Sequence, residues 1–393
     1  MNDLFLRKGA DHRLRGGHLW VYSNEVDSQR SPLGEFTAGD LVTVKNANDK
    51  VLGCAYMEPN ALICARVYAP AEQRAMDAQL FSSRLETALA ARQAAFDRPF
   101  YRLVYGDSDT LPGLIIDRFG DFLVMQLNNT GLERYREPLL EALITILKPR
   151  GILLRADSRS RREQGLATDS EVVHGEVPQQ VSLEENGVKF LAPVYDGQKT
   201  GWFYDHRMSR ARLGTWANGK SVLDVYSYIG GWGIQAAAFG ATQVCCLDSS
   251  AQALEGVEVN ARLNGVEAHV TTRRGSAPEL MAAMHAHGSR FDVVILDPPA
   301  FIQRKKDLKK GFAAYRRINE LGLQLLPSGG LLVSASCSMH LARADLITAM
   351  QQAAVRTGCQ IRVVEQGSQG PDHPVHPAIP ETEYLKAVFA RKL

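Results

Sequence analysis

The sequence predicts an α/β protein: a C-terminal doubly wound parallel sheet, preceded by a small β-barrel domain and an α+β central domain. Three observations support this prediction. From about Lys220 onward, short apolar runs alternate with segments of helical period, which is typical of a parallel sheet covered on both faces. The first 70 residues contain short β-like runs broken by turns. The region between them mixes helical and β-like segments.

The composition is that of a globular protein, with 45% hydrophobic and 22% charged residues among 393. A net charge of +2 permits a nucleic-acid partner without requiring one. No apolar stretch approaches the roughly 20 residues of a membrane span, and the polar, basic start lacks the apolar part of a secretory signal. The six cysteines include no CxxC pair. We therefore expect reduced thiols, a cytoplasmic location, no membrane partner and no metal site.

The first predicted domain covers residues 1–70. Its expected strands are residues 18–22, 41–44, 51–56 and 62–68, and no long helical pattern separates them. A small β-barrel or sandwich fits this pattern.

The second predicted domain covers residues 74–180. It begins with a helix over residues 76–96, which Asp97-Arg-Pro99 ends. The remaining predicted elements are strands at residues 101–105, 114–117, 122–127 and 152–155, and a helix at 133–147.

The third predicted domain covers residues 181–393. Asn186-Gly187 lies between two β-like runs and predicts a hairpin, since both residues tolerate a positive φ. The sheet then follows in alternating order, with strands at residues 222–225, 243–247, 270–273, 293–296 and 331–335, and helices at 234–239, 251–263, 278–285 and 308–326.

A glycine-rich turn follows the first strand of this sheet, in Val222-Leu-Asp-Val-Tyr-Ser-Tyr-Ile-Gly-Gly-Trp-Gly233. Such a turn lets the backbone approach a ligand closely, and Asp248, at the end of the second strand, is placed to bind a ribose diol. The glycines do not match the dinucleotide fingerprint, and Asp224 would repel a pyrophosphate. S-adenosylmethionine, which is cationic and has no phosphate, fits better. The alternative is a glycine turn kept for helix–sheet packing.

Asp297-Pro-Pro-Ala-Phe301 ends the fourth strand. Prolines cannot continue a ladder, so they stop the strand and stiffen the loop beside the cofactor crevice. A flat base could be held there by Asp297 and Phe301. The alternative is a plain strand terminator.

Cys337 follows the fifth strand, between Ser336 and Ser338. Strands four and five are neighbours in the usual doubly wound order, so Cys337 and Asp297 should face one crevice. That position favours a nucleophile, although a lone cysteine is more often an inert buried residue. His340 could lower the pKa of the thiol or could be a surface histidine. Cys245 and Cys246 lie in mid-strand and are expected in the core.

These motifs, together with Thr200-Gly-Trp-Phe-Tyr-Asp-His-Arg207 and Glu383-Tyr-Leu-Lys386, resemble the bacterial 23S ribosomal RNA 5-methylcytosine methyltransferases. The resemblance implies an N-terminal RNA-binding PUA domain, a central α+β domain and a Rossmann-like class I methyltransferase domain that uses S-adenosylmethionine. It implies catalysis by Cys337 as nucleophile and Asp297 as the residue that holds the base and supplies a proton. The cofactor-binding residues that it implies are Asp205, Arg207, Asp224, Tyr226, Ser227, Gly230, Gly233, Asp248, Ser249, Ser276 and Asp297.

The chain departs from that family's pattern at two places. Pro298 and Pro299 occupy the stretch where many RNA 5-methylcytosine enzymes carry a second cysteine, so the base that removes the C5 proton is unassigned. Ser276 lies near the position of an acidic residue that commonly binds the adenine amino group, which puts adenine contact in doubt.

RNA contact is expected from basic residues. Two clusters stand out, Arg155, Arg159, Arg161 and Arg162 after a strand, and Arg304, Lys305, Lys306, Lys309 and Lys310 after the Asp-Pro-Pro loop. The second is better placed to bind phosphates, although a solvated face is the usual role of such runs. The resemblance assigns RNA binding to Lys8, Arg13, Arg15, Trp20, Phe301, Arg304, Lys305 and Lys306.

The sequence thus predicts an RNA cytosine C5 methyltransferase acting on 23S ribosomal RNA or a large-subunit precursor. Three alternatives stay open: a methyltransferase of exocyclic amines (adenine N6 or guanine N2) that uses the Asp-Pro-Pro loop, a non-catalytic RNA-binding ribosome assembly factor, and a nicotinamide-dependent oxidoreductase. The residues do not decide between a monomer and a homodimer.

Overall fold

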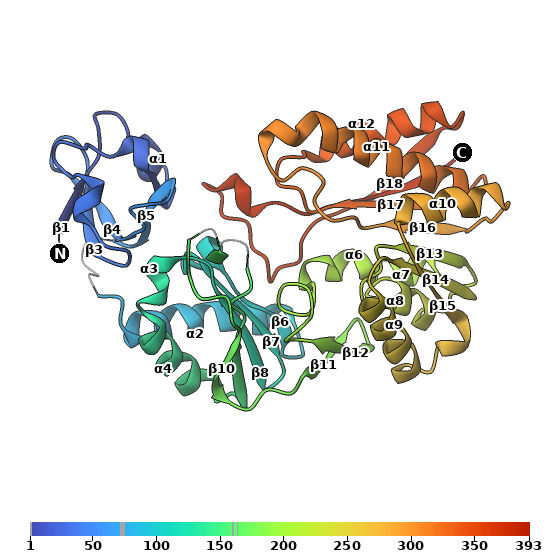
Figure 1. Cartoon of the computed structure of the whole chain (residues 1–393), viewed down its shortest axis with the longest axis horizontal. Helices are drawn as coiled ribbons and strands as arrows, with labels where there is room; N and C mark the ends of the chain where they lie inside the picture. Colours follow the sequence, from blue (N-terminus) through green and yellow to red (C-terminus); the bar gives the residue numbers. More distant parts are fainter. Residues whose placement is uncertain (1, 71–74, 159–160, 163) are drawn as a thin grey trace. The chain divides into compact units, whose positions relative to one another are not determined.

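The computed structural model describes residues 2–70, 75–158, 161–162 and 164–393. Its elements are coloured along the chain in Figure 1. They form two compact units. The first comprises Met1–Val181, Pro193–Trp202 and Pro371–Thr382, and the second comprises Ser182–Ala192, Phe203–Gly370 and Glu383–Leu393.

The N-terminal part of the first unit is a five-stranded sheet, within the described residues, in the order β1-β3-β4-β5-β2. Its elements are β1 (Asn2–Phe5), α1 (His12–Arg15), β2 (Trp20–Tyr22), β3 (Leu41–Lys45), β4 (Val51–Met57) and β5 (Ile63–Ala69). Alternate residues of β3, Val42 and Val44, enter the core, as expected for a strand with one buried face. The four strands expected here are confirmed, and β1, which was not predicted, pairs in parallel with β3.

The rest of the first unit is an α+β layer. Its described strands follow the order β10-β9-β8-β7-β6. The elements are α2 (Ala78–Ala95), β6 (Phe100–Tyr105), β7 (Leu114–Phe119), β8 (Phe122–Leu127), α3 (Thr130–Glu133), α4 (Arg136–Leu147), β9 (Gly151–Leu154) and β10 (Glu171–Gly175). Leu85 of α2 and Leu139 of α4 share one core with Ile116 and Met125 of the sheet.

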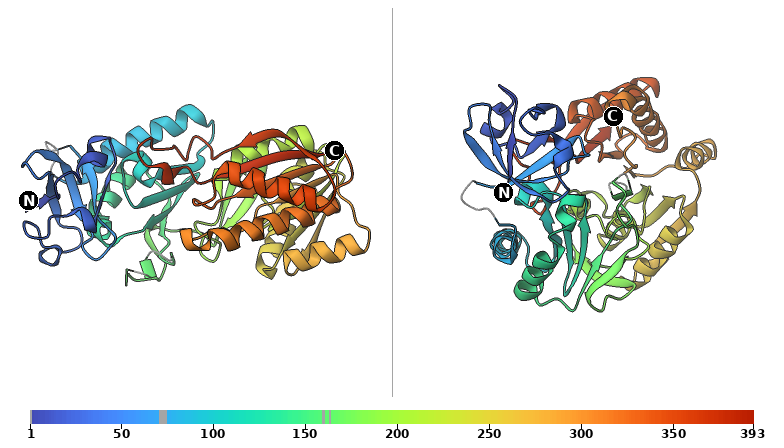
Figure 2. Two further views of the ribbon diagram at one scale, coloured as in Figure 1. Left: turned by 90° about the horizontal axis from the view of Figure 1, so that it is seen from above. Right: turned by 60° about the vertical axis from the view of Figure 1, so that its left-hand side comes forward.

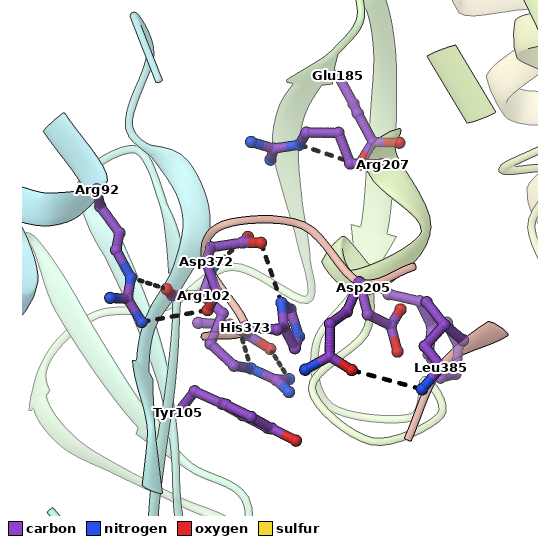
Figure 3. A network of polar contacts seen from close by, with 12 residues as sticks. Arg92, Arg102, Tyr105, Glu185, Asp205, Arg207, Asp372, His373 and Leu385 are labelled. Carbon is purple, nitrogen blue, oxygen red and sulfur yellow. Dashed lines mark hydrogen bonds and ion pairs between the residues drawn. The ribbon is translucent and has the colours of Figure 1, made fainter. Parts of the chain in front are cut away.

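A late segment of the chain, residues 371–382, belongs to this first unit (Figure 3). The Arg92 guanidinium donates to the Asp372 carbonyl at 3.2 Å, and the Arg102 backbone N–H donates to the Asp372 carboxylate at 3.1 Å. The His373 ring nitrogen Nδ1 lies 3.0 Å from the other oxygen of that carboxylate. These buried contacts anchor the segment to α2 and β6.

The second unit is a Rossmann-like α/β domain preceded by a hairpin. The elements are β11 (Gln180–Glu185), β12 (Val188–Pro193), α6 (Arg207–Ala211), α7 (Leu213–Trp216), β13 (Ser221–Val225), α8 (Gly233–Ala238), β14 (Gln243–Asp248), α9 (Ala251–Leu263), β15 (Val270–Arg274), α10 (Ala277–Ala286), β16 (Val293–Leu296), α11 (Leu308–Leu325), β17 (Leu331–Ser336), α12 (Arg343–Arg356), β18 (Ile361–Gly367) and β19 (Lys386–Lys392). Asn186 and Gly187 both have a positive φ at the hairpin turn, which confirms that prediction.

The large sheet has the strand order β15-β14-β13-β16-β17-β19-β18 across residues 221–392, all of which are described. The first five strands of this order are parallel, as predicted. β19 runs antiparallel to both β17 and β18, an edge that the sequence analysis did not predict. The chain order reverses between β13 and β16, and ligands of such sheets bind outside the carboxyl ends of the strands at that point.

Helices cover both faces of this sheet, with α10, α11 and α12 on one side and α8 and α9 on the other (Figures 1 and 2). On the first side, Met281, Leu321 and Leu346 pack against Leu223 and Leu296 of the sheet. Cys245 and Cys246 are buried in β14, as predicted. Among the described residues, no helix is long and apolar enough to cross a membrane.

Candidate active site at the carboxyl edge of the sheet

Three chemistry-bearing residues lie at the carboxyl ends of adjacent strands. Asp224 is in β13, Asp297 directly follows β16, and Cys337 directly follows β17. β16 pairs with β13 and with β17 in parallel register, with Leu296 opposite both Val225 and Ser334. The pairing of β16 with β17 confirms the predicted adjacency of strands four and five. Because the carboxyl ends of parallel strands meet at one edge of a sheet, the three residues lie along the same edge.

Asp297 is held by a histidine and a tryptophan. The Nε2 atom of His206 lies 3.1 Å from Asp297 Oδ1, and the indole Nε1–H of Trp232 donates to Oδ2 at 3.0 Å. Burial alone would raise the pKa of Asp297. The His206 ring and the Trp232 hydrogen bond outweigh burial and lower the pKa below its ordinary value. The carboxyl group is therefore ionised at neutral pH and has no proton to supply, so the proton-donating role that the resemblance implied for Asp297 does not fit, whereas its role in holding the base stays a prediction.

The serines beside Cys337 hold its loop in place. The Ser336 hydroxyl donates to the Tyr315 hydroxyl at 2.8 Å and accepts the Ser338 backbone N–H at 3.1 Å. The Ser338 hydroxyl lies 2.9 Å from the same tyrosine oxygen and accepts the backbone N–H of Ile302 at 3.3 Å. Both serines are buried, whereas Cys337 is half-buried. The network therefore ties the cysteine loop to the loop that follows Asp297.

A buried lysine lies beside this loop. Lys386, the first residue of β19, is paired with Ser336 in the ladder, and its Nζ donates to the Ser338 carbonyl at 2.5 Å. Burial lowers the pKa of Lys386 to about 8, although the electrostatic interaction with Cys337 acts in the opposite direction. An ammonium group so close to a thiol favours the thiolate.

The turn after β13 has an unusual backbone. Tyr226 and Tyr228 have φ values of 66° and 49°, in the left-handed region that non-glycine residues seldom adopt. The Asp248 carboxylate accepts the backbone N–H groups of Tyr228 and Ser250, each at 2.9 Å. The end of β14 thus fixes the strained turn, and Asp248 itself is half-buried.

The burial and hydrogen bonds of Asp224 show whether a cationic cofactor fits at this edge. Its side chain is 0% exposed, and its Oδ2 accepts the Gly233 backbone N–H at 2.8 Å. Its Oδ1 has no hydrogen-bond partner among the described residues. Burial, with the charges of Asp297 and Asp248, raises the pKa of Asp224 to about 7. A buried carboxylate oxygen without a partner is rare and suits a cation, so these residues fit S-adenosylmethionine.

Packing within the protein accounts for both glycines predicted to admit the cofactor. A Cβ atom at Gly233 would lie 2.6 Å from the Cys246 sulfur, and one at Gly230 would lie 2.7 Å from Ile234. Gly230 also has a φ of 86°. The helix–sheet packing that the sequence analysis gave as an alternative is therefore a sufficient reason for both.

Asp205 and Arg207 are nearly buried. Asp205 Oδ2 accepts the hydroxyl of Tyr384, and the Arg207 guanidinium lies 3.6 Å from the buried carboxylate of Glu185 (Figure 3). Glu185 also forms an ion pair with Arg210 at 2.6 Å. The role of Asp205 and Arg207 toward the cofactor stays a prediction.

The other residues predicted to bind the cofactor or the target nucleobase lie around the same edge. Ser227 is buried, Ser249 and Ser276 are exposed beyond β14 and β15, and Ser276 is the N-cap of α10. The Phe301 ring packs on Tyr315 with 4.8 Å between centroids. Phe301 is half-buried. It packs against Tyr315, the same tyrosine whose hydroxyl holds the cysteine loop.

Arg304, Lys305 and Lys306 are exposed at the start of the turn that leads into α11, so they are accessible to phosphates. The other predicted basic cluster is different. Arg155 and Arg161 are buried, and they bind protein carbonyls together with Asp157 and Glu133 respectively, so the expected charged surface there is wrong for these two. Arg159 lies outside the described residues.

The four RNA-binding candidates of the first unit divide into two pairs. Lys8 and Arg15 are exposed. Arg13 forms an ion pair with Glu25 at 2.7 Å, and the Trp20 indole donates to Asp107 at 2.8 Å. Arg15 also lies 3.3 Å from the Asp11 carboxylate, so three of the four already form contacts within the protein.

Sequence reasoning missed His206, Trp232, Tyr315 and Lys386. His206, Trp232 and Lys386 lie inside motifs that the sequence analysis quoted, so their positions were available but their contacts were not. Tyr315 lies within a predicted helix, and no local signal marks it.

Comparison with known proteins shows the family to which the chain belongs. An S-adenosylmethionine-dependent methyltransferase family model matches residues 149–391, and a PUA-like domain model matches residues 4–70. Ribosomal RNA large subunit methyltransferase I of Shewanella denitrificans is 36% identical over 392 residues, which is 98% of each chain. The protein of the same name from Vibrio cholerae is 36% identical, covering 99% of each chain.

Solved structures share the fold. SMU.776, crystallised in complex with SAH, matches with a TM-score of 0.85 at 21% identity over 100% of both chains. Trm5b from Pyrococcus abyssi matches 70% of this chain and 74% of its own, with a TM-score of 0.54 at 17% identity. The relatives over the whole length, the family models and the site together show that the chain belongs to the ribosomal RNA large subunit methyltransferase I family, with S-adenosylmethionine as cofactor and a PUA-like N-terminal domain.

Proposed function

We propose that this protein methylates C5 of a cytosine in large-subunit ribosomal RNA through a covalent adduct between Cys337 and cytosine C6. The observation that carries the proposal is the environment of Cys337. Its half-buried thiol lies between two buried serines, on a loop that is hydrogen-bonded to the one following Asp297. A structural core cysteine needs neither the position at the sheet edge nor this anchoring.

The chemistry follows from that arrangement. Cytosine C5 is a poor nucleophile. Addition of the Cys337 thiolate to C6, with uptake of a proton from solvent at N3, turns the ring into an enamine that is nucleophilic at C5. S-adenosylmethionine, when bound, supplies the methyl group that C5 accepts. A base then removes the C5 proton, the C5–C6 double bond re-forms, the thiolate leaves with its electron pair, and N3 returns its proton to solvent. Asp297 holds the N3/N4 edge of the ring throughout.

The ribosomal substrate is supported by the names of the relatives and by charge. Both cited relatives are named as ribosomal RNA large subunit methyltransferases. The exposed cations Arg304, Lys305 and Lys306 follow the Asp297 loop, where they could bind the phosphates that flank a target nucleotide. The base must leave its stack to reach the thiol.

The test is covalent trapping. RNA transcribed with 5-fluorocytosine should form a denaturation-resistant complex with the protein and S-adenosylmethionine, because fluorine cannot leave as a proton does. Cys337→Ala should abolish both the complex and methyl transfer. Cys359→Ala, which removes another half-buried thiol of the same unit, should leave both unchanged. Full methylation of RNA by Cys337→Ala would reject the C5 mechanism and favour methylation of an exocyclic amine.

A further inference from the structure

A buried imidazole lies directly behind the carboxylate that would hold the base. His206 ends a short turn, Tyr204–His206, and its side chain is almost fully buried. Its Nε2 lies 3.1 Å from Asp297 Oδ1, and its ring packs on Trp232 with 5.4 Å between centroids. The contact joins residues 91 positions apart and is formed within one unit of the fold.

Asp297 is the polar partner of this ring. The other ring nitrogen, Nδ1, is buried and has no hydrogen-bond partner among the described residues. Two other charged groups act on the ring from nearby, since Asp205 favours its protonated form and Arg210 opposes it. Asp224 also lies close enough to act on Asp297. Removing the charge of Asp297 should therefore make protonation of His206 less favourable and lower the pKa of His206.

We propose that His206 is a positioning residue that keeps Asp297 ionised and oriented as a hydrogen-bond acceptor, so that the site selects a base whose edge carries an amino group. This inference rests on the proposed function and extends it from the reaction to the choice of base.

The carboxylate has the lone pairs that this role needs. Each Asp297 oxygen receives one donor from the protein, from His206 or Trp232. Each oxygen retains a further acceptor position, because a carboxylate has about four. Cytosine offers its N4 amino group and, once the thiolate has added, a protonated N3. Uracil offers O4, an acceptor, which an ionised carboxylate repels. Sites built for a donor discriminate strongly against a base that lacks it.

Burial makes the histidine necessary. Without a neighbouring cation, a carboxyl group in this position would bind a proton more tightly, because burial raises its pKa. The protonated form would present an O–H donor to the base. The pKa of His206 is correspondingly raised by Asp297 despite the opposing effect of burial.

The first experiment tests the pair without RNA or cofactor. Side-chain NMR of the full-length protein follows the ring nitrogens of His206 through a pH titration, with the His206→Gln spectrum assigning the signal among ten histidines. We expect a midpoint above the ordinary histidine value of about 6.5 in the wild type and below it in Asp297→Asn. A wild-type midpoint at or below that value, or no change in Asp297→Asn, would overturn the inference.

The second experiment measures trapping by 5-fluorocytosine RNA from pH 5.5 to 8.5. Glutamine at position 206 retains a donor but not the charge, so the ratio of the His206→Gln rate to the wild-type rate should fall at least fivefold toward low pH. The ratio removes the common pH dependence of the thiol. His269→Gln, which changes an exposed histidine, should give a ratio near one at every pH. A pH-independent ratio for His206→Gln would reduce His206 to a structural residue.

Base choice is tested by replacing 5-fluorocytosine with 5-fluorouracil. We expect the wild type to trap the uracil analogue at least tenfold more slowly, and this preference should shrink in His206→Leu. Equal trapping of both bases by the wild type would refute the proposed selection. If no RNA is trapped while His206 still titrates with Asp297, the C5 mechanism fails and the histidine–aspartate pair stands.

Discussion

Asp224 carries a large energetic cost at the site, and replacing it should stabilise the protein above pH 7. The Asp224→Asn substitution removes a buried charge whose Oδ1 has no partner among the described residues, while an amide oxygen can still accept the Gly233 N–H. The ordinary pKa of the group is 3.8, and burial raises it to about 7. The folded state binds this proton more tightly than the unfolded state. Protonation of Asp224 therefore contributes fully to the free energy of unfolding below about pH 4, and this contribution is lost as pH rises toward 7.

The magnitude follows from the two pKa values. Each pH unit between them corresponds to 1.36 kcal/mol, so the ionised group costs about 4 kcal/mol above pH 7 but only about 1.5 kcal/mol at pH 5. The new amide N–H groups lack partners and cost roughly 1–3 kcal/mol at any pH. The advantage of Asp224→Asn should therefore grow by about 2–3 kcal/mol between pH 5 and pH 8.

Calorimetry of the full chain can measure this change. The transition of the second unit is the one that S-adenosylmethionine moves, and about 2–4 °C per kcal/mol is typical of domains of this size. The melting temperature of Asp224→Asn relative to wild type should rise by about 5–10 °C between pH 5 and pH 8. Asp292→Asn is the mirror control: hydrogen bonds from Ser221 lower the pKa of Asp292, so this variant should lose stability as pH rises above 4. A pH-independent difference for Asp224→Asn would refute the reasoning.

Three other substitutions test separate contacts. Glu185→Gln leaves Arg210 buried without its counter-charge and should cost about 3–5 kcal/mol of stability, measured by calorimetry; an unchanged melting temperature would contradict it. Lys386→Met removes the ammonium beside Cys337, so iodoacetamide should alkylate that thiol several times more slowly at pH 7, and equal rates would argue against a thiolate stabilised by lysine. Ser338→Ala removes the acceptor of the Ile302 N–H, so single-turnover methylation should slow by about tenfold without a change in S-adenosylmethionine affinity; weakened cofactor binding would show that the loop serves both sites.

The parallel strands of the large sheet, the adjacency of β16 and β17, and the hairpin turn were predictable from the sequence, because alternating apolar strands and helices and particular turn residues indicate them. Parallel strands carry every residue that follows them to one edge, so the relation of Asp297 to Cys337 follows from topology alone. The hairpin at Asn186-Gly187 follows from two residues that tolerate a positive φ. Both inferences needed no knowledge of which side chains touch.

Contacts between distant side chains were not predictable in the same way. Charge suggested that Arg161 faces solvent, yet it is buried against Glu133, 28 positions earlier in the chain. The contact of His206 with Asp297 depends on how the segment before β13 folds over the sheet edge, and no periodicity encodes that. The antiparallel β19 had a local signal, the apolar run after Lys386, but its pairing with β17 is a long-range choice.

The distribution of unfavourable features over the second unit argues that the carboxyl edge is built for a ligand. Away from the edge, buried charge is compensated, as in the pair formed by Glu185 and Arg210. At the edge, Tyr226 and Tyr228 hold left-handed backbone angles that cost about 1–2 kcal/mol each, and Asp224 has a buried oxygen without a described partner. A chain able to pair buried charges elsewhere has no packing reason to leave this one open. A bound cation would turn the cost of Asp224 into affinity, and its binding would stabilise the folded state by mass action.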